Sequence, residues 1–296
     1  MTTKRAAALV RDSVKPDAPP TEIADLLTEV IAKHDNCDPD EAREQAERMK
    51  DEVLTVLQHE VDALAEMGRP SLVGFNSSSE YLVQGAAFIE GTESEELKRF
   101  KKRRASLVEY VPALQALSPR RLEFLCKGIL EALGVEKAVV TQYTRDEGID
   151  FYGLWLPAEL LFGTDHLPGP TKQLKVWLVG QTKRLDESAA GTPDLRDLVG
   201  AVCLAKGRAF ASRAGSKYAG LAIRTADPVI VLFITTGRLS RDGWRLVESS
   251  GVVAMDGETL AAFLTDRKIG ITDGAFNPDE LNTWLDTTEL GSHNIK

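Results

Sequence analysis

The sequence has few of the residues on which extracellular folds and histidine-based catalytic centres depend. Only three cysteines occur among 296 residues, Cys37, Cys126 and Cys203, and they are odd in number and far apart. This set predicts no disulfide framework and indicates a reducing compartment. Only four histidines occur, so a site built on several histidines has few candidates. We expect no zinc site at His34, Cys37 and His59, because no second Cys-x-x-Cys pair accompanies them.

Long apolar runs and phosphate loops are also missing. No apolar run approaches the roughly 20 residues that span a bilayer. The first residues soon meet charge and proline, unlike those of a signal peptide. No G-x-x-x-x-G-K-[ST] loop is present, which argues against an NTPase. The sequence therefore predicts a cytoplasmic protein with no membrane partner.

Basic residues are outnumbered by acidic ones: the sequence has 36 Lys and Arg against 45 Asp and Glu, which gives a net charge of −9. This balance argues against a protein that coats nucleic acid by bulk charge, but it allows a local basic groove. Six cations fill the seven positions 98–104, which fits a solvated helix end and a phosphate-contacting segment equally well. No acid occurs between Asp197 and Asp227. We expect nucleic-acid contacts from the cations of that stretch and from a neighbouring arginine, namely Lys206, Arg208, Arg213, Lys217, Arg224 and Arg184.

The amino-terminal third is acidic and has helical periodicity. Residues 1–66 hold 8 Lys and Arg against 16 Asp and Glu, which is nearly the whole imbalance. Apolar residues recur at helical spacing after Thr21, and again after Asp38 as far as about Met67. We interpret residues 1–113 as a mostly helical N-terminal region that ends with the basic run and offers acidic helices to a partner protein.

The pattern changes after residue 113 to alternating helices and strands. Ser118 and Pro119 are typical of a helix start. Strands are predicted at 138–140, 149–152, 174–181, 229–234 and 252–255, and later helices at 194–205, 240–249 and 257–264. This order predicts an α/β domain with a mixed sheet over residues 114–272. Residues 273–296 are polar, and we expect a loosely packed C-terminal tail.

Three polar side chains at the ends of two predicted strands are candidates for a catalytic site. Asp150 opens one predicted strand, whereas Gln181 and Lys183 end the next one and share a face because strand residues i and i+2 point the same way. If the two strands pair, the three side chains converge at one sheet edge. A carboxylate and a second oxygen ligand hold a hard divalent cation, and an ammonium orients the attacking water and offsets charge on phosphorus. This geometry suits metal-assisted phosphodiester hydrolysis.

Five ordered sequence blocks extend the pattern beyond these residues. They are Leu122-Glu123-Phe124-Leu125 with Leu133-Gly134, then Asp146-Glu147-Gly148-Ile149-Asp150 and Val179-Gly180-Gln181-Thr182-Lys183-Arg184, then Leu195 to Ala201, Phe233 to Ser240, and Met255 to Leu260. In this order they resemble the catalytic domain of Mrr-type restriction endonucleases, in the PD-(D/E)xK nuclease superfamily. The resemblance spans roughly Ser118 to Leu264, which is about half of the chain.

The resemblance implies a restriction-endonuclease-like α/β/α core that cuts DNA with Mg²⁺, with Mn²⁺ as a substitute. It assigns metal binding to Asp150, Gln181 and Glu123, and the catalytic lysine to Lys183. Asp146 matches a further acidic position of the second block. Two features depart from the pattern: Glu147 replaces the more usual glycine, and residues 157–172 form an insertion of open role.

The main hypothesis is therefore a Mg²⁺-dependent endodeoxyribonuclease of prokaryotic restriction or anti-phage defence. We expect a homo-oligomer, because cutting both strands usually needs two active sites. One alternative is a nuclease-fold subunit whose cleavage depends on a partner protein or nucleic acid in a defence complex. A nuclease for RNA, or for branched or modified DNA, is a third interpretation. The sequence does not indicate which DNA sequence is cut.

Overall fold

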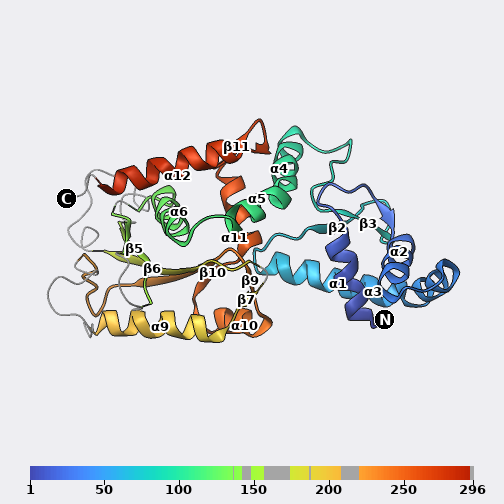
Figure 1. Ribbon diagram of the computed structural model, residues 1–296, viewed down its shortest axis with the longest axis horizontal. Coiled ribbons are helices and arrows are strands. Elements are labelled where there is room, and N and C mark those ends of the chain that lie inside the picture. The colour runs from blue at the N-terminus through green and yellow to red at the C-terminus, as the bar shows by residue number, and fades with distance from the viewer. Residues whose placement is uncertain (136, 142–147, 157–173, 187, 208–219, 294–296) are drawn as a thin grey trace. The chain divides into compact units, whose positions relative to one another are not determined.

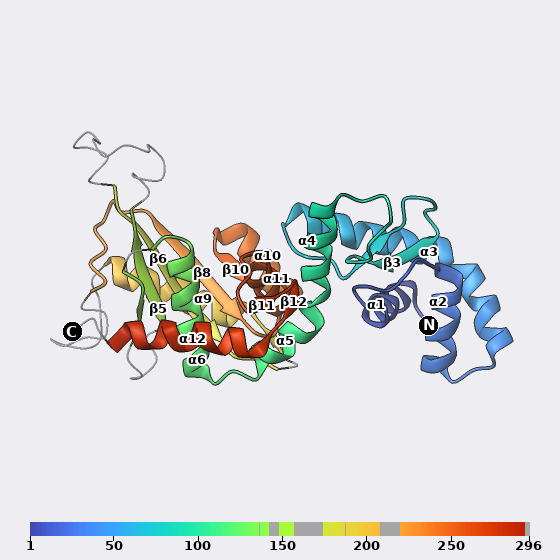
Figure 2. The same ribbon diagram turned by 90° about the horizontal axis from the view of Figure 1, so that it is seen from above.

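The computed structural model describes residues 1–135, 137–141, 148–156, 174–186, 188–207 and 220–293 (Figures 1 and 2). The chain forms two compact units. The N-terminal unit contains Met1–Tyr110 and Ala262–Asn277, and the sheet unit contains Val111–Ala261 and Pro278–Lys296. The predicted boundaries were 113/114 and 272/273. In the structure, Ala262–Asn277 group with the N-terminal unit, and Pro278–Lys296 of the predicted tail group with the sheet unit.

The N-terminal unit is built around a group of helices. They are α1 (Thr3–Ser13), α2 (Ile23–Asp35) and α3 (Pro39–Glu66), and their apolar faces form one core. The two predicted helices are thereby confirmed as α2 and α3. A small antiparallel sheet completes the unit in the order β1-β3-β2, from β1 (Thr21–Glu22), β3 (Leu82–Gly85) and β2 (Val73–Phe75). These strands are too short to give a periodic sequence pattern.

Helix α3 is the longest helix of the unit, with 28 residues, and it is amphipathic. Ala46, Val53 and Leu57 are fully buried, whereas the opposite face carries exposed charged residues. Within the described part of the chain, no helix is both long enough and apolar enough to cross a bilayer.

The basic run at 98–104 lies on helix α4 (Glu95–Ala105). Three of its cations form ion pairs within the unit, since Lys98 binds Glu95, Lys101 binds Glu93 and Arg104 binds Asp266. Helix α5 (Leu107–Gln115) follows, and the strands β11 (Ile271–Thr272) and β12 (Ala275–Phe276) pair beside α4. Half of the cations in the basic run are thus neutralised by carboxylates of the same unit. This favours a solvated helix end over a segment that contacts phosphates.

The sheet unit contains a five-stranded mixed sheet in the order β10-β8-β6-β5-β4. Its strands are β4 (Val139–Val140), β5 (Phe151–Trp155), β6 (Val176–Lys183), β8 (Val229–Thr235) and β10 (Val253–Met255). Strand β8 runs parallel to both of its neighbours, β6 and β10. Strand β5 runs antiparallel to both of its neighbours, β4 and β6. All five strands lie where the sequence predicted them. Apolar β6 is central, as its composition suggested.

Helices cover both faces of this sheet (Figure 1). One face carries α6 (Pro119–Ala132) and α12 (Pro278–His293), and the other carries α9 (Thr192–Lys206) and α10 (Arg241–Ser250). Helix α11 (Gly257–Asp266) follows β10, and the short strands β7 (Ala189–Ala190) and β9 (Arg238–Leu239) form a separate parallel pair. The predicted α/β/α fold class is confirmed.

The prediction of a loose tail after residue 272 is wrong. Residues 278–293 form helix α12, which packs against α6 and buries Leu281 and Leu285. The buried Lys127 of α6 donates hydrogen bonds to Glu131 and to the carbonyl of Thr288 on α12. Few apolar residues anchor this helix, so its sequence has little of the periodicity by which a helix is recognised.

Candidate active site

The pairing of β5 with β6 fixes the position of Asp150. Phe151 is the register partner of Gly180, so Asp150 lies beside the end of β6. The amide of Asp150 donates to the carbonyl of Gly180 at 2.9 Å, and the amide of Thr182 donates to Asp150 Oδ2 at 2.8 Å. The carboxylate is therefore held against the β6 backbone by a hydrogen bond from a main-chain amide.

Gln181 and Lys183 belong to the face of the sheet that α9 covers. Alternation along β6 places them on the side of Trp177 and Val179, which pack in the core beneath α9. The oxygen Oε1 of Gln181 is buried, and among the described residues it has no hydrogen-bond partner. A buried acceptor without a partner costs about 1–3 kcal/mol. This oxygen is thus available to a ligand.

Lys183 has a partner that the sequence pattern did not include. Its ammonium Nζ binds Oδ1 of Asp194, which lies in the first turn of α9. The second oxygen of that carboxylate accepts the amide of Gly191 at 3.1 Å, as in a capping box. A Gly-Thr-Pro-Asp start is visible in the sequence as a helix cap, but its contact with Lys183 depends on how α9 packs against β6.

The surroundings of Asp194 keep its carboxylate ionised. Partial burial raises its pKa, but the hydrogen bonds from the Lys183 ammonium and the Gly191 amide lower it by more, so the net pKa lies below the usual value. The ion pair is half-exposed at the lysine, whose side chain is 44% exposed, and more buried at Asp194, at 19%.

Glu123 projects from α6, which covers the opposite face of the sheet. It is buried, and Arg120 Nη1 donates to its Oε2 at 2.5 Å and to the carbonyl of Thr141 at 2.9 Å. Thr141 in turn donates from its amide to the carbonyl of Asp150 at 2.8 Å. A continuous set of contacts therefore joins Glu123 to the backbone of Asp150, and an arginine holds the carboxylate predicted to bind metal.

The thiol of Cys126, on helix α6, is fully buried. Burial raises the pKa of its thiol, and the negative charges of Asp150 and Glu123 raise it further. The thiol itself stays protonated and is not a nucleophile.

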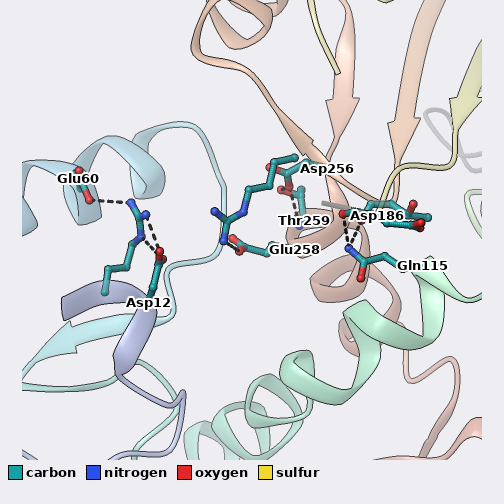
Figure 3. A network of polar contacts seen from close by, with 10 residues as sticks. Asp12, Glu60, Gln115, Asp186, Asp256, Glu258 and Thr259 are labelled. Atoms are coloured by element: carbon teal, nitrogen blue, oxygen red, sulfur yellow. Dashed lines mark hydrogen bonds and ion pairs between the residues drawn. The ribbon is translucent and has the colours of Figure 1, made fainter. Parts of the chain in front are cut away.

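The chain after Lys183 is fixed by hydrogen bonds rather than left as a free loop. Gln115 of α5 donates to the carbonyls of Asp186 at 3.0 Å and of Thr236 at 3.4 Å (Figure 3). The hydroxyl of Thr236 accepts the amide of Leu185 and donates to its carbonyl. The carboxyl ends of β6 and β8 are thereby tied together beside the candidate site.

The donor set fits a hard divalent cation in part. Asp150 and Gln181 offer oxygen ligands, and the buried, unpartnered Gln181 oxygen is the strongest indication of a missing ligand. One oxygen of Glu123, Oε2, is already bound to Arg120, so an arginine shares this carboxylate. Within the described ranges, no group of three or more His, Cys, Asp and Glu side chains is arranged to hold a metal ion.

The predicted nucleic-acid contacts are placed only in part. Lys206 is exposed at the end of α9, and Arg184 is exposed but close to Asp186, at 3.5 Å. Arg224 is used inside the fold, because it binds the buried carboxylate of Asp227 at 2.6 Å. Arg208, Arg213, Lys217, Asp146, Glu147 and the insertion at 157–172 lie outside the described residues.

Three solved structures are similar to this chain. They are the MspJI restriction endonuclease in complex with a 27-mer oligonucleotide (17% identity, TM-score 0.38), the DNA modification-dependent restriction endonuclease AspBHI (14%, 0.39) and the restriction endonuclease FokI bound to DNA (10%, 0.36). The matches cover 68%, 73% and 95% of this chain, and 39%, 47% and 46% of those chains. This chain therefore spans less than half the length of each.

Sequence comparison gives a more local result. No curated protein matches the sequence. The family model of the Mrr catalytic domain, described as restriction endonuclease, matches residues 114–211. This segment includes Glu123, Asp150, Gln181, Lys183 and Asp194, and thus all the side chains of the candidate site. The resemblance seen in the sequence is confirmed for residues 114–211, the segment that matches this family model.

Proposed function

We propose that this protein is a divalent-metal-dependent endonuclease that hydrolyses phosphodiester bonds in DNA. The observation that carries the proposal is the edge of the β5–β6 pair. There Asp150 is held by the Thr182 amide, the Gln181 oxygen is buried without a described partner, and Lys183 lies on the same strand face as Gln181. The match of residues 114–211 to a restriction endonuclease model supports a nuclease that acts on DNA.

Each side chain has a defined task in this proposal. Asp150 and Gln181 would hold Mg²⁺, or Mn²⁺ in its place, through oxygen, with Glu123 joining them. The bound cation would neutralise phosphate charge and lower the pKa of a water molecule. The Lys183 ammonium donates hydrogen bonds to the attacking water and to the phosphate oxygens, whose negative charge grows as the bond to phosphorus forms.

Three finer features belong to the same proposal. The family description as restriction endonuclease supports a role in prokaryotic restriction or anti-phage defence. A homo-oligomer would supply the second active site that cutting both strands needs. The exposed Lys206 and Arg184, together with Arg208, Arg213 and Lys217, would contact the phosphate backbone. Equilibrium sedimentation with and without DNA measures the oligomeric state directly.

A cleavage assay tests the proposal. Supercoiled, linear, methylated and single-stranded DNA and a matched RNA are incubated with the protein in Mg²⁺, in Mn²⁺ and in EDTA. We expect cleavage of DNA that EDTA abolishes. Asp150→Asn and Lys183→Ala should each lower the rate by about 100-fold or more. Asp242→Asn, which removes an exposed carboxylate on α10, is the matched control and should cut at the wild-type rate.

The same assay separates the alternatives. Cleavage by Asp150→Asn or Lys183→Ala at the wild-type rate would refute the assignment of the site. Preferential cleavage of the RNA would show that RNA, and not DNA, is the substrate. A wild-type protein that binds DNA but cuts it only after a partner protein is added would support the partner-dependent subunit instead.

A further inference from the structure

We infer that Asp194 is a positioning residue for Lys183: its carboxylate, fixed in the first turn of α9, holds the lysine ammonium at the end of β6. This inference rests on the proposed nuclease function, in which Lys183 contacts the attacking water. It adds to the site a residue that the Asp…Gln-x-Lys pattern does not contain, and one that comes from a different layer of the fold.

The contacts leave the Asp194 carboxylate little freedom. One oxygen binds the Lys183 ammonium, and the other accepts the Gly191 amide at 3.1 Å. The helix cap thus fixes the orientation of the carboxylate, and the carboxylate fixes the ammonium. The Asp194 side chain is only 19% exposed, so water competes weakly for this ion pair from its side.

Lys183 needs such a partner because its own side chain is flexible. A lysine side chain carries about 2 kcal/mol of rotamer entropy, and its ammonium can bind in many directions. At a reacting centre, a displacement of about 1 Å lowers the rate by about 100-fold. Asp194 stays charged at neutral pH, since its surroundings lower its pKa, so the ion pair persists throughout the neutral range.

Asp194 also caps α9, and a purely structural role must be separated from positioning. Asparagine makes this distinction, because its amide oxygen can still accept the Gly191 amide but carries no charge for Lys183. A residue that only caps the helix tolerates Asp194→Asn. A residue that holds Lys183 through its charge does not.

The experiment compares Asp194→Asn with Asp242→Asn. Asp242 lies in the first turn of the neighbouring helix α10 and pairs with Arg245, so the control also removes a helix-terminal charge and an ion pair. We expect Asp194→Asn to lower the single-turnover cleavage rate by about 10- to 100-fold, with DNA affinity in EDTA and unfolding temperature close to the wild type. Asp242→Asn should match the wild type in all three measurements.

A second measurement does not depend on cleavage. The ¹⁵N resonance of the Lys183 ammonium reports whether this group is held in an ion pair. It should shift or broaden in Asp194→Asn and stay unchanged in Asp242→Asn. Asp194→Glu, which keeps the charge, should recover part of the lost rate. If Asp194→Asn does not fold, Asp194→Ser takes its place, because its hydroxyl can also accept the Gly191 amide.

The outcomes distinguish this inference from the proposed function. Cleavage by Asp194→Asn at the wild-type rate, or an unchanged Lys183 resonance, would overturn the inference while the loss of activity in Asp150→Asn still stands. A rate loss explained entirely by weaker DNA binding would overturn it as well. If wild-type protein cuts no substrate, the proposed function fails, and the Lys183 resonance alone decides whether the ion pair exists.

Discussion

At the scale of single residues, Gly180 allows the Phe151 ring and the backbone of β8 to lie close against β6. It immediately precedes Gln181, and its backbone passes against the ring of Phe151 and the carbonyl of Leu232. A Cβ atom at this position would lie 2.2 Å from the Phe151 ring and 2.8 Å from that carbonyl oxygen. The backbone oxygen belongs to the neighbouring strand β8 and cannot move without disturbing the sheet.

We therefore expect Gly180→Ala to destabilise the protein by about 1–3 kcal/mol, since the added methyl group overpacks a closed interior. Gly200 on α9 is the matched control, because a Cβ atom there meets no described heavy atom within 4 Å. Gly200→Ala should leave stability unchanged or raise it by up to about 1 kcal/mol. Urea unfolding measures both. Equal midpoints for the two variants would contradict this account of Gly180.

The candidate site residues that depend on strand pairing alone could be proposed from the sequence, and their roles stay a prediction. Asp150 at a strand start and the spacing of Gln181 and Lys183 are local features, and the pairing of β5 with β6 places Asp150 beside the end of β6. Asp194 could not be predicted in this way. Its role depends on the packing of α9 over β6, and in the sequence it has the appearance of an ordinary helix cap.

At the scale of elements, α12 shows how a helix with a polar sequence can be part of the core. Leu281 is 3% exposed and Leu285 is 1% exposed against the sheet unit. Gly128 of α6 leaves room for the ring of Trp284, since a Cβ atom there would lie 2.4 Å from it. A few well-placed side chains thus anchor 16 residues.

We expect Leu285→Ala to lower the free energy of unfolding by about 2–5 kcal/mol, because it leaves a cavity between α12 and its neighbours. Leu290 lies on the same helix and is 68% exposed, so Leu290→Ala is the control and should change stability by less than about 0.5 kcal/mol. Thermal unfolding of the two variants checks the difference. A similar loss from both would show that α12 is not anchored as described.

The same helix explains where element prediction failed. Between residues 119 and 266, the sequence predicts the described helices and the five strands of the main sheet, which have apolar runs or caps that mark them, but not the two-residue strands β7 and β9. In α12 the apolar positions are few and separated by threonine, aspartate and asparagine, so the periodicity is weak. The strands β1, β2 and β3 were missed for a related reason, since each has only two to four residues.

At the scale of the whole molecule, the acidic composition sets how stability depends on pH. The chain carries 45 acidic residues, but only those with native partners link protonation to folding. Asp227 is the clearest case. Its buried carboxylate accepts hydrogen bonds from the Arg224 side chain and amide and from the indole of Trp177. These contacts, the Arg224 side chain foremost, lower the pKa of Asp227 to about 2.

A lowered pKa in the folded state means that the ionised carboxylate stabilises the fold above its unfolded pKa of about 3.9. This contribution disappears as the pH falls from there towards about 2. We therefore expect Asp227→Asn to lower the urea midpoint at pH 7, and the gap from the wild type to narrow steadily below about pH 4. The exposed Asp197 provides the control, because Asp197→Asn should follow the wild-type curve throughout. A gap that stays constant between pH 7 and pH 3 would mean that Asp227 stabilises the fold through packing rather than through its charge.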